Sequence, residues 1–232
     1  TTTVQMISSI LRAKGKKVLL IDLDSQGNLS MFNGCFDQDS SQVTELLNKK
    51  PFKVVNDVVS ANYNLAALEI KNPIASDQLK NCIACIDTLY KNYDYIIIDT
   101  SPSLGTLTVN GLLASDYVVI PTQADGGAFE GAKQTLSLIN SFNNKLEKKI
   151  KVAGILLTCF NPRVVLYQRY LELYNNLAKE HGTKVFENYI PKGVSIQEAQ
   201  ALKEDLLKYG SGTKPVKAYK KFVDELLKEI EE

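Results

Sequence analysis

Short apolar runs alternate with longer amphipathic stretches along the 232-residue chain. Runs rich in Val, Ile and Leu are typical of buried parallel strands. The strong runs are 16–22, 94–99, 116–121 and 151–158, and the weaker strand candidates are 65–70 and 185–190. The stretches with helical periodicity are 1–14, 76–91, 103–114, 128–148, 163–181, 196–209 and 214–230. This alternation predicts an α/β fold, a doubly wound, mostly parallel sheet with helices on both faces.

Length and composition fit one globular domain spanning 1–232. No repeat, low-complexity tract or linker interrupts the pattern, and no apolar run approaches the length of a membrane-spanning helix. The formal net charge of +1 does not indicate a nucleic-acid binder, so an anionic partner would need a local basic patch. The four irregularly spaced cysteines favour free thiols in a reducing cytoplasm.

Two polar signals favour structural roles over chemistry. Cys82 and Cys85 form a C-x-x-C pair, but no second pair completes a zinc site, and the surrounding pattern is that of an amphipathic helix. His181 is the only histidine and stands before Gly182, which is typical of a helix C-terminus closed by glycine. We therefore expect neither a metal-binding cysteine pair nor a catalytic histidine.

The polar residues that follow the strong runs are the candidates for chemistry, because ligands bind at the carboxyl ends of parallel strands. Asp22 and Asp24 follow the first run and lie on the same side of an extended chain. Two carboxylates placed in this way can bind Mg²⁺, or one of them can orient a water molecule. The alternative is that one carboxylate caps a neighbouring helix, and the pair alone does not decide between these roles.

Two more signals gain meaning only in combination. Asp99 ends the run YIIID, as the magnesium-associated Asp of a Walker B strand does, and the alternative is an Asp that begins a turn before Pro102. Thr1, Thr2 and Thr3 open an amphipathic helix, where hydroxyls usually act as caps. A phosphate-binding loop also ends in G-K-[ST] at a helix start, where a hydroxyl binds Mg²⁺ and backbone amides hold phosphate.

Five stretches of the sequence occur in the order found in one family of ATPases. They are TTTVQMISSILRAKGKKVLLIDLDSQGNLS, YDYIIIDTSPSLGTLTVNGLLASDYVVIPTQ, FEGAKQTL, GILLTCFNPR and VFENYIPKGVSIQEA. In these stretches the chain resembles the ParA family of deviant Walker A P-loop ATPases, which carries KGGVGKTTT, a helix and then VLLIDLDPQGN. Because the stretches span nearly the whole chain in the family's order, the resemblance is highly specific.

The resemblance implies a role for individual residues. Asp24 corresponds to the catalytic Asp that orients the attacking water, and Thr1 corresponds to the threonine that binds Mg²⁺. Asp22 corresponds to the Asp that supports the metal site, and Asp99 corresponds to the Walker B Asp. The implied nucleotide contacts are Thr1 and Thr2 beside the phosphates, and Asn161, Pro162, Ile190 and Pro191 near the adenine.

The sequence departs from the family pattern in several places. The glycines and lysines of KGGVGK are absent from the sequence, and so is the apolar strand that should precede them. We expect a segment of roughly 15–20 residues, one strand and a glycine-rich loop, to precede Thr1 in the natural protein. Ser25 replaces the common Pro in the switch-like loop that contains Gly27 and Asn28, and 196–209 has a helical pattern where the family has a short loop.

The resemblance also implies a function. It indicates an ATPase that uses ATP/ADP and Mg²⁺ and alternates between an ATP-bound homodimer and an ADP-bound or nucleotide-free monomer. The dimer would bind DNA without sequence preference, and a ParB-like centromere-binding partner would stimulate hydrolysis. The protein would then be cytoplasmic, nucleoid-associated and engaged in plasmid or chromosome partition.

Two alternatives accompany this prediction. The first is a MinD-like membrane switch, which would end in a basic amphipathic helix. Here the last helix ends in acidic turns that anionic lipid would repel, so no stable membrane association is expected. The second is a non-catalytic scaffold that keeps the fold and has lost the phosphate loop.

Because the net charge is small, DNA binding would require a basic patch that dimerisation gathers in two copies. The candidate contacts are Arg163, Arg169, Lys192, Lys214, Lys217, Lys220 and Lys221. For each lysine of the last helix, the alternative is that it solvates the outer face of that helix.

Overall fold

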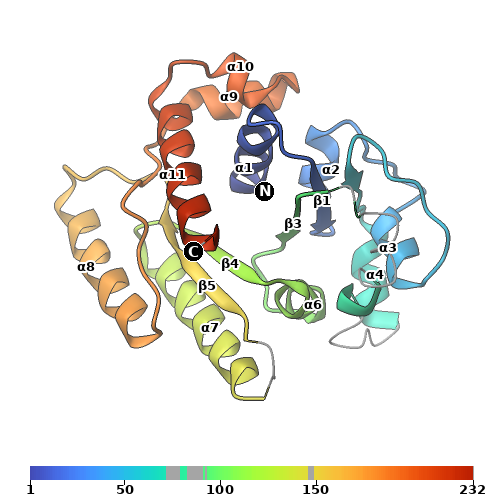
Figure 1. Ribbon diagram of the computed structural model, residues 1–232, viewed down its shortest axis with the longest axis horizontal. Coiled ribbons are helices and arrows are strands. Elements are labelled where there is room, and N and C mark those ends of the chain that lie inside the picture. Colours follow the sequence, from blue (N-terminus) through green and yellow to red (C-terminus); the bar gives the residue numbers. More distant parts are fainter. Residues whose placement is uncertain (72–78, 83–90, 92, 146–148, 232) are drawn as a thin grey trace. The chain divides into compact units, whose positions relative to one another are not determined.

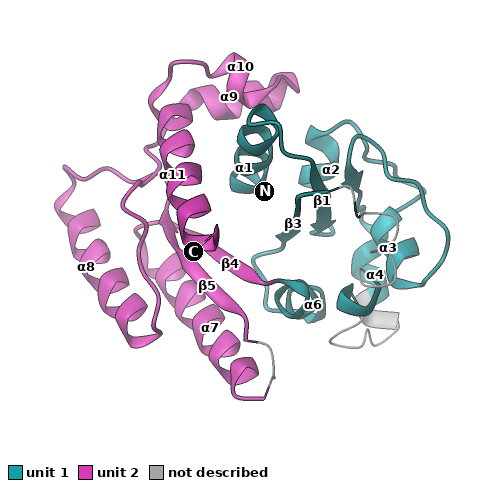
Figure 2. Cartoon of the chain, viewed as in Figure 1, with its two compact units in different colours: residues 1–115 teal, residues 116–232 magenta. Residues whose placement is uncertain are grey.

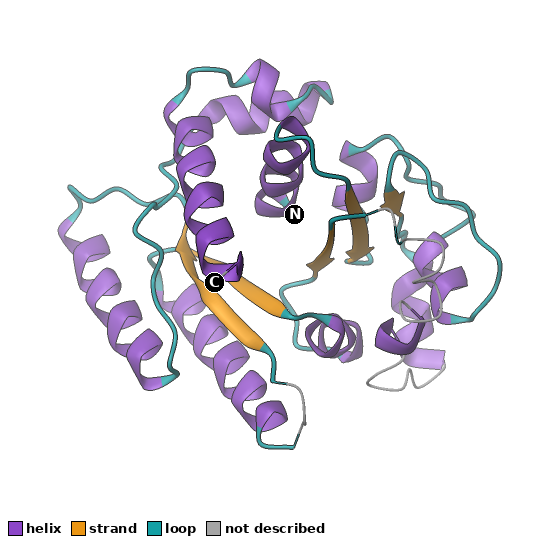
Figure 3. Ribbon diagram, in the orientation of Figure 1, coloured by secondary structure: helices purple, strands orange, loops and turns teal. Residues whose placement is uncertain are grey.

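The computed structural model describes residues 1–71, 79–82, 91, 93–145 and 149–231. The chain forms two compact units, Thr1–Ser115 and Asp116–Glu232, which Figure 2 shows in different colours. Each unit contains its own strands and helices (Figure 3), and each is described by itself. The strand pairs of both sheets in the described part of the chain are parallel, so the predicted α/β class with a parallel arrangement is confirmed. A single domain over 1–232 stays a prediction.

The first unit is built on a three-stranded sheet in the order β2-β1-β3. β1 (Val18–Leu23) lies in the centre, between the short β2 (Val58–Val59) and β3 (Tyr95–Thr100). Every residue of β1 is buried, as expected for a central strand that is covered on both faces. The register pairs Asp22 of β1 with Asp99 of β3, which brings the carboxyl ends of the two strands together.

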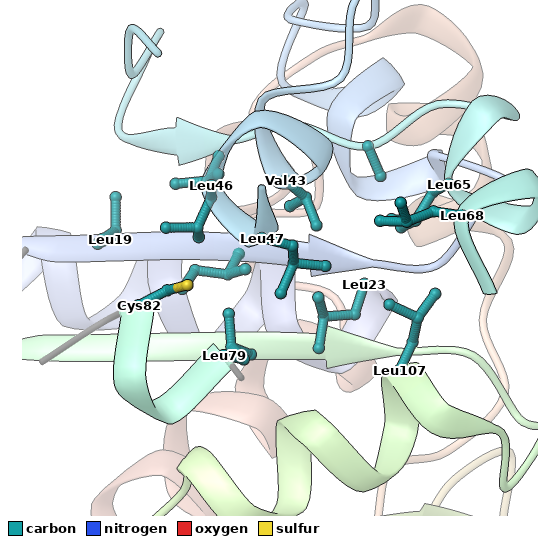
Figure 4. Close-up of a cluster of buried hydrophobic side chains, with 13 residues drawn as sticks. Leu19, Leu23, Val43, Leu46, Leu47, Leu65, Leu68, Leu79, Cys82 and Leu107 are labelled. Atoms are coloured by element: carbon teal, nitrogen blue, oxygen red, sulfur yellow. The ribbon is translucent and has the colours of Figure 1, made fainter. Parts of the chain in front are cut away.

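Helices cover both faces of this sheet. They are α1 (Thr2–Ala13), α2 (Asn28–Phe32), α3 (Gln42–Leu47), α4 (Asn64–Lys71) and α6 (Thr106–Ala114). Side chains alternate across a strand, so Leu19, Ile21 and Leu23 share one face of β1. These residues form an apolar cluster with side chains of α3, α4 and α6 (Figure 4). α1 contacts β1 and β3 and lies on the side away from α3 and α4 (Figure 1).

The second unit contains the parallel pair β4 (Tyr117–Thr122) and β5 (Lys151–Leu157). Its helices are α7 (Gly126–Asn143), α8 (Val165–Glu180), α9 (Val194–Leu202), α10 (Leu206–Tyr209) and α11 (Lys214–Glu231). An apolar cluster joins Ile120 of β4 and Ile155 of β5 to side chains of α7 and α8. These two helices therefore cover the strands through one shared core.

The last helix packs its apolar stripe inside the second unit. The buried side chains of α11 are Pro215, Val216, Tyr219, Phe222, Val223 and Leu226. Phe222 meets Phe186 edge to face, with ring centroids 4.9 Å apart. A Cβ at Gly154 of β5 would lie 2.7 Å from the Phe186 ring, so the ring rests directly on the strand backbone. Phe186 therefore forms a packed bridge between β5 and α11.

The four strong strand predictions are confirmed as β1, β3, β4 and β5. The prediction of a strand at 65–70 is wrong, because this segment belongs to α4. Leu65 and Leu68 are buried at helical spacing, and Asn62 Oδ1 accepts a hydrogen bond from Asn64 N at the helix start (3.0 Å). The Ala, Leu and Glu residues of the segment also have high helix propensity.

Two other predictions need correction. At 185–190 only Val185 pairs as in a strand, through an isolated parallel bridge with Ile155 of β5. The long helix predicted at 196–209 is broken into α9 and α10, because Lys203 adopts a left-handed conformation with φ of 54°. Asp205 then caps the second helix by accepting hydrogen bonds from backbone amides at its start.

The remaining helix predictions are confirmed as α1, α6, α7, α8 and α11. His181 is the C-cap of α8 and Gly182 follows it with φ of 65°, as predicted. The predicted helix at 76–91 lies largely outside the described residues, and so does Cys85. Among the helices that the structure describes, none combines the length and the apolar character needed to cross a membrane.

Candidate functional site

Three aspartates lie at one edge of the sheet in the first unit. Asp22 and Asp99 are register partners on the parallel strands β1 and β3, so their side chains share a face, and Asp24 follows β1 directly. Their exposed fractions are 0%, 3% and 9% in the order Asp22, Asp99, Asp24. The structure therefore brings together the three carboxylates that the sequence indicated, in a place largely shielded from water.

Asp22 accepts hydrogen bonds through both carboxylate oxygens. Oδ1 accepts from Asp24 N (3.1 Å), and Oδ2 accepts from Ser30 N (3.0 Å) and Ser30 Oγ (2.7 Å). The Ser30 hydroxyl in turn accepts a hydrogen bond from Ala61 N (2.9 Å). This network ties the end of β1 to α2 and to the segment after β2. Asp22 consequently holds both ends of the loop that begins at Asp24.

The electrostatics of this edge favour a cation. Burial raises the pKa of Asp22 from its ordinary value of 3.8 to about 6, while the Ser30 hydroxyl lowers it and the neighbouring Asp99 charge raises it. A neighbouring negative charge disfavours the ionised form of a buried carboxylate such as Asp22, and a nearby positive charge favours it. A cation bound here would therefore stabilise the ionised site.

The loop after Asp24 has a shape that requires glycine. Asp24 Oδ1 accepts from Gln26 N (3.0 Å), and the Asp24 carbonyl oxygen accepts from Gly27 N (2.8 Å). Gly27 has φ of 64°, and a Cβ at this position would lie 2.6 Å from the Phe36 ring. Because α2 starts at the next residue, Gly27 fixes the direction in which the chain leaves the site.

Asp99 carries a carboxylate oxygen that lacks a partner among the described residues. Its Oδ1 lies 2.8 Å from the backbone nitrogen of Thr1, whereas its buried Oδ2 meets no hydrogen-bond donor in the described part of the chain. An unsatisfied buried acceptor costs about 1–3 kcal/mol. Thr1 is the N-cap of α1 and its side chain makes no capping hydrogen bond. The start of α1 thus meets one oxygen of the Asp99 carboxylate and leaves the other, Oδ2, for a ligand.

These donors fit Mg²⁺ with an incomplete protein shell. Within the described ranges, no group of three or more His, Cys, Asp and Glu side chains is arranged to hold a metal ion. Mg²⁺ is usually held by one or two carboxylates, with waters and substrate phosphates as its other ligands. The unpartnered oxygen of Asp99 and a threonine hydroxyl at the helix start are hard oxygen donors of the required type.

The residues assigned to adenine lie in the second unit, where two loops meet. They are Asn161 and Pro162 after β5, and Ile190 and Pro191 before α9. Phe160 N donates to the Ile190 carbonyl oxygen (3.0 Å), and Ile190 N donates to the Leu157 carbonyl oxygen (2.8 Å). The structure therefore brings these two loops together at the carboxyl end of β5, which is where parallel sheets bind ligands.

The basic candidates all lie exposed on the second unit but on different elements. Arg163 precedes α8, Arg169 lies on α8, Lys192 precedes α9, and Lys214, Lys217, Lys220 and Lys221 lie on α11. Lys221 lines a hollow of about 420 Å³ whose walls include Asp224 and Glu225. Lys184 and Lys228 line the same hollow, so its wall carries charges of both signs and does not rank Lys221 against the other lysines of α11.

Sequence reasoning did not single out Ser30, the residue that connects Asp22 to Ala61. A serine at a helix start is too common a signal to indicate this role, and only the long-range contact reveals it. We expect Ser30→Ala to lower the free energy of unfolding by about 1–3 kcal/mol, because Asp22 Oδ2 and the buried Ala61 N–H each lose a partner. Denaturant unfolding of the variant measures the change.

The exposed Ser40 offers a matched control for this substitution. Ser40→Ala removes the same hydroxyl from the surface, where changes usually stay within about 0.5 kcal/mol. Equal stabilities of the Ser30 and Ser40 variants would contradict the role of the Ser30 hydroxyl.

Comparisons with known proteins identify the family. Residues 1–152 match the family model described as an AAA domain. The chain is 33% identical over 229 residues to the sporulation initiation inhibitor protein Soj of Bacillus subtilis, covering 94% of this chain and 89% of Soj. It is 31% identical over 239 residues to the chromosome partitioning protein ParA of Myxococcus xanthus, covering 98% and 83% of the two chains.

A solved structure is also similar throughout. It is cobyrinic acid a,c-diamide synthase from Mycobacterium smegmatis with a bound ATP analogue and magnesium, with 28% identity and a TM-score of 0.77. The similarity covers 99% of this chain and 89% of that chain, which supports the P-loop ATPase fold class. Together with the ordered motifs and the aspartates at the ends of β1 and β3, these relatives show that the chain belongs to the ParA family of partitioning ATPases.

Proposed function

We propose that this protein binds ATP and Mg²⁺, hydrolyses the nucleotide, and uses its nucleotide state to partition DNA. The observation that carries the proposal is the buried Asp99 Oδ2, which lacks a partner among the described residues, on a carboxylate whose Oδ1 contacts the start of α1. Asp22 and Asp24 complete the acidic edge around it. The similar synthase structure holds an ATP analogue and magnesium, which supports the same ligands here.

In this proposal each residue has a separate task. Bound Mg²⁺ would neutralise charge on the phosphate oxygens. The Thr1 hydroxyl and Asp99 would hold the ion, and Thr2 would lie beside the phosphates at the positive end of α1. Asp24 would orient the attacking water, and Asp22 would support the metal site by fixing the Asp24 backbone. The proposed adenine contacts are Asn161, Pro162, Ile190 and Pro191.

The proposal extends to partners of the family type. ATP would join two copies of the chain, and the dimer would bind DNA without sequence preference through the basic residues of the second unit. A ParB-like protein would stimulate hydrolysis and return the dimer to monomers. The similarity to a chromosome partitioning protein supports this cycle, and its DNA-bound stage would associate the protein with the nucleoid.

The two alternative functions fit the geometry less well. A membrane switch needs an amphipathic helix with an available apolar face, but Phe222, Val223 and Leu226 of α11 are buried in the second unit. In a scaffold without catalysis, the unpartnered Asp99 Oδ2 would only lower the stability of the fold. In an ATPase, a bound ligand would supply the missing partner. The ATPase therefore accounts for more of the observed contacts.

We expect Asp99→Asn in the full-length protein to weaken the Mg²⁺ dependence of ATP hydrolysis. Loss of a residue that supports a metal site typically costs about 10–100-fold in metal affinity or activity. Titration of hydrolysis with Mg²⁺ measures the shift in half-saturating concentration. The exposed Asp39 provides the control, since Asp39→Asn removes a surface charge of the same unit.

Assays of ATP binding and hydrolysis on the wild-type protein test the wider proposal. Mg²⁺-dependent ATP hydrolysis by the full-length protein would support it, and absence of ATP binding would contradict it. Equal Mg²⁺ dependence of wild type and Asp99→Asn would remove Asp99 from the metal site while leaving the ATPase activity in place.

A further inference from the structure

The segment before Pro191 is held between two elements of the second unit. On one side it follows β5, where Phe186 N donates to the Ile155 carbonyl oxygen (2.9 Å) and Ile190 N donates to the Leu157 carbonyl oxygen (2.8 Å). The backbone amides of Glu187 and Asn188, between these two contacts, donate instead to α11 on the opposite side. We call residues 185–190 the strap, because hydrogen bonds hold this segment on both sides, although only Val185 pairs as in a strand.

The second anchor is the carboxylate of Glu225 on α11. Its Oε1 accepts from Glu187 N (2.9 Å), and its Oε2 accepts from Asn188 N (3.2 Å) and Asn188 Nδ2 (2.7 Å). One carboxylate thus satisfies two consecutive backbone amides and a side-chain amide. Hydrogen bonds to an ionised acceptor are shorter and stronger than neutral ones, so Glu225 fixes the path of the chain two residues before Ile190.

The helix that presents Glu225 is itself rigidly packed. Phe222 lies one turn earlier on α11 and contacts the Phe186 ring, and Leu226 is buried next to Glu225. Glu225 is half-buried at the wall of the open hollow, so its carboxylate can be changed without removing apolar contacts from the core. These two features suit a residue that positions a loop more than one that maintains the fold.

We propose that Glu225 is a positioning residue for adenine recognition, acting through Asn188 on the loop that contains Ile190 and Pro191. This inference rests on the proposed function, in which that loop contacts the base. Glu225 would touch neither the nucleotide nor the reacting atoms. Its loss would loosen the loop against the adenine and leave the phosphate and metal groups of the first unit unchanged.

The expected effect is selective for the base. Glu225→Gln keeps the shape of the side chain but replaces one acceptor oxygen by an NH₂ group. That group cannot accept a hydrogen bond from the Glu187 or Asn188 amides. We expect the affinity for Mg²⁺-ATP to fall about tenfold, which corresponds to about 1.4 kcal/mol, while the affinity for inorganic tripolyphosphate with Mg²⁺ stays unchanged. Because Glu225 acts on the adenine loop and not on the reacting groups in this proposal, KM should rise and kcat should change little.

The experiment measures both dissociation constants by calorimetry on the full-length protein. Asn188→Ala removes one of the three hydrogen bonds and should produce a smaller loss in the same direction. Glu229→Gln is the matched control, since it breaks the ion pair between Glu229 and Lys184 one turn further along α11 and keeps the three hydrogen bonds of Glu225. The control should bind both ligands as the wild type does.

Each outcome has a distinct meaning. A fall in ATP affinity alone for Glu225→Gln supports the inference. Equal losses for ATP and tripolyphosphate would show a general structural role and overturn it, and so would unchanged affinities for both. Failure of the wild type to bind ATP would contradict the proposed function itself. Thermal unfolding of each variant identifies a loss of fold, and Asn188→Ala still tests the strap if Glu225→Gln does not fold.

Discussion

Asp24→Ala in the full-length protein is expected to bind ATP normally and to hydrolyse it about 10²–10⁴-fold more slowly, the usual contribution of a positioned proton acceptor or water-orienting group. Asp24 sits directly after β1 at the acidic edge, and its Oδ1 is oriented by Gln26 N at 3.0 Å. Its carboxylate is nearly buried but follows the strand end where ligands bind. Single-turnover hydrolysis and nucleotide affinity, measured together, test both halves of this expectation.

The adjacent Gln26 gives the control for Asp24. Gln26→Ala truncates an exposed side chain of the same loop and keeps the backbone amide that bonds to Asp24. We expect its turnover to stay near that of the wild type. Unchanged turnover in Asp24→Ala would remove Asp24 from the mechanism, and a loss of ATP binding equal to the loss of turnover would assign it a structural role instead.

The strands that place the site could be predicted because their pattern is unambiguous. β1 and β3 are continuous apolar runs that end in aspartates, and parallel pairing brings such ends to one edge. The contacts that shape the site were not predictable in the same way. Asp22 depends on Ser30, which lies 8 positions away in α2, and through Ser30 on Ala61, which lies 31 positions beyond Ser30. No local pattern encodes contacts at these separations.

The error at 65–70 has a different physical origin. A short apolar run fits a buried strand or a buried helix equally well, and periodicity alone does not separate them. Here the hydrogen bond between Asn62 and the Asn64 amide starts a helix, and the burial of Leu65 and Leu68 on one face stabilises it. The hydrogen bonds of Glu225 could not be predicted from the sequence either, because a glutamate in a charged amphipathic helix usually lies on its solvent-exposed face.

DNA affinity is expected to fall about 10³–10⁵-fold between 50 and 200 mM salt if the ATP-bound dimer contacts six to ten phosphates. The net charge of +1 is too small for general attraction, so binding must come from local cations that release counterions from DNA. Lys217 and Lys220 of α11 are exposed members of the candidate set, and neither lines the hollow that contains Asp224 and Glu225. Binding should also require ATP, since dimerisation gathers two copies of each lysine.

Lys217→Gln and Lys220→Gln should each weaken binding to all DNA sequences by a similar factor. Each lost phosphate contact should reduce the magnitude of the salt slope, d log K against d log [salt], by about 1. A variant dimer loses one such contact in each subunit. Lys133→Gln on α7 removes an exposed lysine from the same unit outside the candidate set and should leave the slope unchanged. Fluorescence anisotropy with unrelated duplexes, in ATP and in ADP, measures these slopes. Salt-insensitive binding would exclude a phosphate-contacting patch, and equal affinity in ATP and ADP would separate DNA binding from the nucleotide-dependent dimer.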